Sequence, residues 1–147
     1  MPRTQEEKMH RTIRSSMLTA AAAAFGLSLL AAPVLAAEPQ PAKEIAAAAQ
    51  HAGFAAGSGD IGGVHTHLHH TVNCLVGPDG EGFAPDQLNP CKTIGNGAIP
   101  DTEDEVTKQS LDAALESANA GLATDDLATA KAEAIKTQSL LEAIAKH

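Results

Sequence analysis

The chain has 147 residues, of which 44% are hydrophobic and 2% aromatic, and its formal charge is −8. This length allows one modest domain. Because nucleic acids and anionic membrane surfaces repel an acidic chain, the charge argues against both as partners and favours cations.

Residues 1–36 have the pattern of a secretory signal peptide. A basic start precedes an apolar run from Leu18 to Ala37, which ends in small residues, so we predict cleavage after Ala36 or Ala37. An uncleaved membrane anchor is the alternative, because the run could just reach across a bilayer. The many alanines and Pro33 favour cleavage. We therefore expect a periplasmic or secreted protein without stable membrane insertion.

Removal of residues 1–36 leaves 111 residues with six lysines, no arginine and 16 acids. Solubility alone would explain such a charge, and attraction of cations is the functional alternative. Residues 37–42 form a linker with two prolines, and residues 43–147 form a single predicted domain.

Two helices are predicted in the first half of this domain. The first runs from Lys43 through EIAAAAQHAGFAA, and the second covers 61–76, with Ser58 or Asp60 as its N-cap. In the second helix the apolar residues recur at intervals of three or four, which is typical of a helical face toward a core. They are Ile61, Val64, Leu68, Val72 and Leu75.

Cys74 and Cys91 are the only cysteines, and we predict that they form a disulfide, as an even pair does in an oxidising compartment. The segment 76–101 is rich in glycine and proline, so it should be a long loop pinned by this bond. A loop of such length is often functional. Redox or thiolate chemistry is the weaker alternative, because no C-x-x-C spacing is present.

Two more helices follow. Thr102 and Glu105 have the spacing of a capping box for the third, and Gly121 is its expected end. The fourth starts at Thr124-Asp125-Asp126, where acids complement the helix dipole. The fold class is therefore all-α, a small up-and-down bundle of two helical hairpins with a thin, alanine-rich core. The bundle closes within one chain or, alternatively, in a homodimer.

Histidines cluster in the second helix. His65, His67, His69 and His70 lie within six residues, and His51 on the first helix should be level with the start of this run. His65 and His69, four residues apart, are spaced to reach one metal ion. We predict a three-imidazole site of these two with His51, completed by water, Asp60 or His70.

His67 and His70 form a second candidate pair on the opposite side of the helix. Neutral imidazole suits copper, zinc or nickel, and Asn73 and Asp60 are candidate acceptors for the remaining ring N–H groups. A structural or solvent-facing role for the histidines is the alternative.

The leader, the segment HAGFAAGSGDIGGVHTHLHH and the alanine-rich hairpin ATDDLATAKAEAIKTQSLLEAIAKH resemble the small histidine-rich helical proteins of the bacterial periplasm that buffer or carry transition metals. The resemblance implies metal storage, resistance or delivery. In that class histidines tend to repeat along every helix, whereas here the third and fourth helices carry none before His147. This departure points to one defined site.

The leading hypothesis is an exported, non-catalytic protein that binds a transition metal through its histidines. No nucleophile-elbow serine and no H-E-x-x-H motif are present, so we do not expect an enzyme. One alternative is an interaction module whose partner is an envelope protein. A further alternative is non-covalent haem binding, since C-x-x-C-H is absent and covalent c-type haem is excluded.

Overall fold

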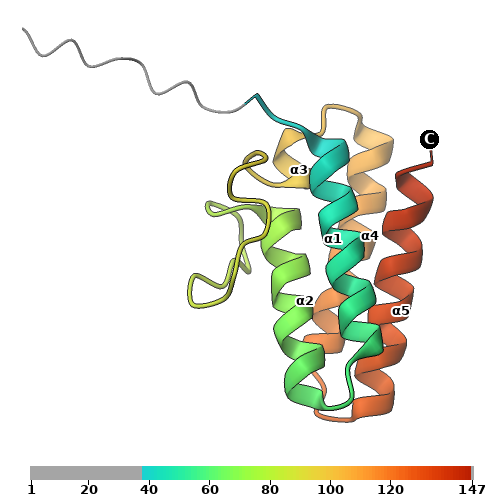
Figure 1. The fold of residues 1–147 in the computed structure, drawn as a ribbon. Coiled ribbons are helices and arrows are strands. Elements are labelled where there is room, and N and C mark those ends of the chain that lie inside the picture. The colour runs from blue at the N-terminus through green and yellow to red at the C-terminus, as the bar shows by residue number, and fades with distance from the viewer. Residues whose placement is uncertain (1–37, 147) are drawn as a thin grey trace, which may run out of the picture. The chain divides into compact units, whose positions relative to one another are not determined.

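The computed structural model describes residues 38–146, and this part of the chain contains helices and no strand. Four long helices run side by side (Figure 1). The helices are α1 (Pro41–Gly57), α2 (Ile61–Val76), the short α3 (Ala98–Asp101), α4 (Glu105–Leu122) and α5 (Leu127–Ile144). The predicted all-α bundle is confirmed, whereas the predicted signal peptide, residues 1–36, lies outside the described residues.

The four long helices pack around a common core, and α2 and α5 also contact each other across it. α1 contacts α2 and α5, and α4 contacts α5 and α2, so the four close into a ring, and α3 packs on α1, α2 and α4. None of the helices within residues 38–146 combines the length and apolar character needed to cross a membrane.

The core is rich in alanine and valine, and its largest fully buried side chains are four leucines, Leu68, Leu75, Leu111 and Leu141. Small side chains let the helices approach closely. Gly121 is the tightest example, because a Cβ there would lie 2.6 Å from Cδ1 of Leu68. The helix end predicted at Gly121 agrees to within one residue, because α4 ends at Leu122, and Gly121 also allows this close approach.

The helix starts differ from the prediction at two places. α1 begins at Pro41, two residues before the expected start, because proline suits the first helical turn, where its missing N–H would have no partner. α4 is capped by Asp104, which accepts a hydrogen bond from Thr107 N at 2.7 Å. The predicted cap, Thr102, instead donates to Ala98 O and closes α3.

The predicted disulfide between Cys74 and Cys91 is present, with 5.1 Å between the Cα atoms. It ties the end of α2 to the long loop before α3. Asn73 fixes the same loop, since its Oδ1 accepts from Ala84 N at 2.8 Å and its Nδ2 donates to the carbonyl oxygens of Ala84 and Leu88. The long loop pinned by a disulfide is thus confirmed, but it is shorter than the predicted 76–101, because Val76 belongs to α2 and residues 98–101 form α3.

Candidate metal centre

Three histidines meet at the interface between α1 and α2. His51 comes from α1, and His67 and His70, one turn apart, come from the face of α2 that packs on α1. Thr71 lies next to this pair and holds the interface, because its Oγ1 is 3.3 Å from the carbonyl oxygen of Ala48. The turn at 58–60 brings the two helices back alongside each other, with Asp60 capping α2 through Gly63 N.

The three imidazoles are close enough to share one ion. One ring nitrogen from each of His51, His67 and His70 lies within 4.8 Å of the other two. The ring centroids are 5.1 Å apart for His51 and His70, 5.5 Å for His67 and His70, and 5.7 Å for His51 and His67. Nitrogens at such separations could coordinate one ion with small side-chain rotations.

The cluster contains ring nitrogens that find no partner. His70 is buried and His51 and His67 are half-buried, and the Nδ1 atom of each has no hydrogen-bond partner and almost no exposure. Buried polar atoms are normally hydrogen-bonded, so three orphans in one place need an explanation. A ligand shared by the three rings would explain them.

The surroundings of His51 and His70 favour their neutral forms. Burial lowers the pKa of His70 to about 4, and the neighbouring His51, His67 and His69 add to the effect. Burial, followed by the proximity of His67, also lowers the pKa of His51. Metals bind the neutral ring, so the lowered pKa values of His51 and His70 favour the form that binds.

Phe54 forms an apolar wall of the cluster. Its ring centroid is 5.4 Å from that of His51, in an edge-on arrangement, and 5.4 Å from that of His67. Its side chain remains 47% exposed. The sequence analysis did not include Phe54, although its position three residues after His51 already places both on one side of α1.

The predicted combination of His51 with His65 and His69 is corrected. Among residues 38–146, one group of three potential metal-ligating side chains has its ligand atoms within 4.8 Å of one another, and it consists of His51, His67 and His70. Nε2 of His65 lies 2.9 Å from the carbonyl oxygen of Thr124, so this ring contacts the turn between α4 and α5. His69 is half-buried, and its Nδ1 has no partner.

Asp60 and Asn73, the predicted acceptors for the remaining ring N–H groups, form other hydrogen bonds. The side chain of Asp60 caps α2 and that of Asn73 anchors the loop, so neither is placed to orient a ligating imidazole. Two flanks border the apolar stripe of α2, and α1 occupies the flank of His67 and His70. Residue spacing does not indicate which flank the preceding helix takes, and for this reason it favoured His65 and His69 over the pair that lies beside His51.

The chain matches no protein-family model, no curated protein and no solved structure. The geometry of the histidine cluster is therefore the basis on which a function is inferred.

Proposed function

We propose that this protein binds one transition-metal ion through His51, His67 and His70. The observation that carries the proposal is the convergence of three ring nitrogens within 4.8 Å of one another. The unpartnered Nδ1 atoms and the lowered pKa of His70 support it, because a buried nitrogen without a hydrogen bond and a neutral imidazole both favour coordination of a metal.

The donor set favours zinc, copper(II) or nickel. Three imidazoles suit these borderline metals, and both cysteines are consumed in the disulfide, so no thiolate is offered to copper(I). Within the described residues no carboxylate joins the group. The fourth position of a tetrahedral site would then go to water or to a donor from another molecule.

The proposed role is metal storage, resistance or delivery by an exported, non-catalytic protein. The disulfide supports export, because such bonds persist in oxidising compartments such as the periplasm. The basic and apolar pattern of residues 1–36 supports it independently. The acidic charge of the chain would raise the local concentration of cations.

Calorimetric titration of the full chain with zinc, copper(II) and nickel, together with elemental analysis, tests the proposal. We compare a His51→Gln/His67→Gln variant with a His65→Gln/His69→Gln variant, which loses the same number of imidazoles outside the cluster. One ion should bind tightly to the parent and to the second variant, and the first variant should lose tight binding. Circular dichroism on both variants shows whether the bundle has formed.

Equal binding by both variants would contradict the proposed site. Background metal content, with altered association of an envelope protein in the first variant, would instead indicate an interaction module. A Soret absorption band in protein expressed with haem supply would indicate a haem protein.

A further inference from the structure

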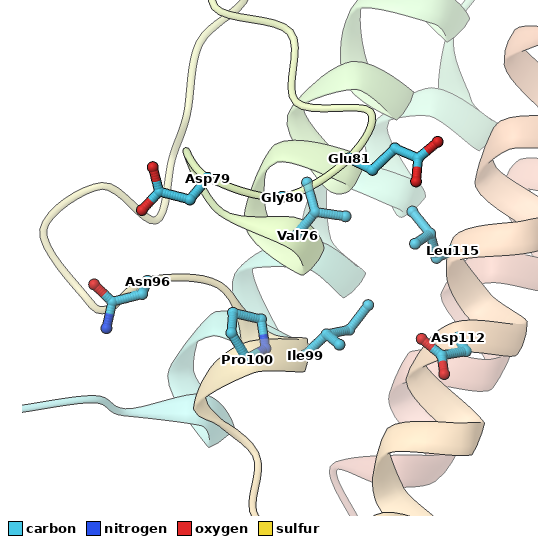
Figure 2. A pocket seen from close by; sticks show the side chains of 9 residues that line it. All are labelled: Val76, Asp79, Gly80, Glu81, Asn96, Ile99, Pro100, Asp112 and Leu115. Carbon is cyan, nitrogen blue, oxygen red and sulfur yellow. The ribbon is translucent and has the colours of Figure 1, made fainter.

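A cavity of about 390 Å³ lies away from the histidine cluster, bounded by the end of α2, the loop that follows it, α3 and α4 (Figure 2). It shares no residue with the cluster. Its size falls in the range that small-molecule sites occupy.

The floor of the cavity is apolar. Val76 at the end of α2, Ile99 and Pro100 in α3 and Leu115 in α4 supply it. Hydrocarbon on such a floor would gain about 25 cal/mol for each Å² removed from water.

Carboxylates surround this floor. Asp79 and Glu81 come from the loop and Asp112 comes from α4, and no lysine or arginine lines the cavity. In residues 38–146 the ion pairs are Lys108–Glu105 and Lys136–Glu133, so none of the three acids has a cationic partner there. The cavity therefore matches a cation in charge.

The acids are spread rather than gathered. Figure 2 shows Asp79 on one side of the cavity and Glu81 and Asp112 on the other, with Val76 and Ile99 between them. Within the described chain, the histidine cluster is the one group whose ligand atoms lie within 4.8 Å of each other, so these three acids do not surround a single ion. An elongated cation would reach both sides.

The type of cationic group follows from what lines the cavity. Quaternary ammonium groups are usually held by aromatic rings, and none of the nine lining residues is aromatic. A primary ammonium offers three hydrogen-bond donors, which suit carboxylates and the amide oxygen of Asn96.

The wall that carries Asn96 is held in place by two hydrogen bonds, of which the first is buried and the second exposed. Oε1 of Glu44, on α1, accepts from Gly97 N at 2.9 Å, and the carboxylate of Asp101 accepts from Asn96 N at 2.7 Å. A wall fixed before binding lowers the entropic cost of taking up a ligand.

We propose that this cavity binds an aliphatic diamine or short polyamine, whose methylene chain lies on the apolar floor while its ammonium groups pair with Asp79 on one side and with Glu81 and Asp112 on the other. This site is independent of the metal centre.

Calorimetric titration of the full chain with 1,4-diaminobutane and with spermidine, at low ionic strength, tests the proposal. Tetramethylammonium and calcium serve as comparison cations. Asp112→Asn removes a carboxylate from the cavity, and Glu116→Gln, one turn later on α4, removes an exposed one outside it. We expect saturable diamine binding that weakens at least tenfold in Asp112→Asn and stays within twofold in Glu116→Gln. The His51→Gln/His67→Gln variant should bind the diamine as the parent does.

No saturable binding of either amine would overturn the proposal. Equal weakening in Asp112→Asn and Glu116→Gln would also overturn it, because the attraction would then be that of the whole acidic surface. Tighter binding of tetramethylammonium or calcium than of the diamine would show that the cavity takes a compact cation, and would contradict the elongated ligand proposed.

Discussion

The rings of His51 and His70 meet edge to face across the α1–α2 interface, with centroids 5.1 Å apart. The two residues are 19 positions apart in the chain, and the helical hairpin brings them together. Burial, followed by the proximity of His51, lowers the pKa of His70, and this favours the neutral form that coordinates metals.

A metal bound at the cluster should stabilise the fold. At a free zinc concentration 100 times the dissociation constant, the free energy of unfolding should rise by about 2.7 kcal/mol, because the ion binds the folded chain only. For a domain of this size each kcal/mol raises Tm by roughly 4–8 °C. Thermal unfolding followed by circular dichroism measures the shift.

The control for this experiment is the matched pair of variants. His65→Gln/His69→Gln should keep the zinc-dependent rise in Tm, and His51→Gln/His67→Gln should lose it. A rise of the same size in both would mean that zinc acts elsewhere on the chain.

Acidification should destabilise the protein through His70. Its pKa is about 4 in the folded state, below the ordinary value near 6.5, so the unfolded chain binds more protons between these values. The stability that the neutral ring contributes is complete above pH 6.5 and is lost as the pH falls toward 4. Burial lowers the pKa of His51 too, and its contribution has the same sign.

Urea unfolding of the metal-free protein at a series of pH values measures this slope. In His70→Gln the slope between pH 6.5 and 4 should become shallower. An unchanged slope would indicate that His70 is not held neutral by its surroundings.

Glu44 should act in the opposite direction. Burial, together with the nearby Asp101, raises its pKa to about 7, so the folded chain holds a proton that the unfolded chain releases near 4.5. Its protonated form therefore stabilises the fold below pH 4.5, and this contribution is lost as the pH rises toward 7. Glu44→Gln cannot ionise, and it should be more stable than the parent at pH 8 by on the order of 2 kcal/mol.

Urea midpoints for parent and Glu44→Gln at pH 5 and pH 8 check this prediction. Glu38→Gln, an exposed change just before α1, is the control and should leave both midpoints unchanged. If the parent were the more stable of the two at pH 8, the ionised carboxylate of Glu44 would be stabilising the fold, which contradicts the prediction.

Much of the fold could be predicted from residue patterns, and the membership of the histidine cluster could not. Helical periodicity and turn residues located the long helices, and the even cysteine count indicated the disulfide. The sequence also placed His51 opposite the histidine run of α2. Which imidazoles of that run face His51 depends on the flank of α2 that α1 covers, and this is a property of tertiary packing.

Glu44 shows a second limit of the same kind. An acid in the first turn of a helix usually faces solvent and interacts with the helix dipole. Here the loop before α3 folds over it, and Gly97 N donates to it. Such a contact between residues 53 positions apart leaves no local pattern, so the sequence analysis did not single out Glu44.

The contact between α4 and α2 depends on the missing side chain of Gly121. In Gly121→Ala the new Cβ would lie 2.6 Å from Cδ1 of Leu68, which is fully buried and has little room to move. Overpacking of this kind costs about 1–3 kcal/mol, and the usual gain from replacing a helical glycine by alanine is smaller. We therefore expect a net loss of stability, measured as a lower urea midpoint.

Gly57→Ala is the matched control, because Gly57 is also helical and a Cβ there would meet nothing within 4 Å. This variant should be as stable as the parent or slightly more stable. Leu68 lies between His67 and His69 on α2. A shift of Leu68 that turns the helix would move these histidines, so Gly121→Ala should then also weaken zinc binding. Zinc affinity equal to that of the parent, together with the lower midpoint, would show that the strain stays within the core and does not reach the cluster.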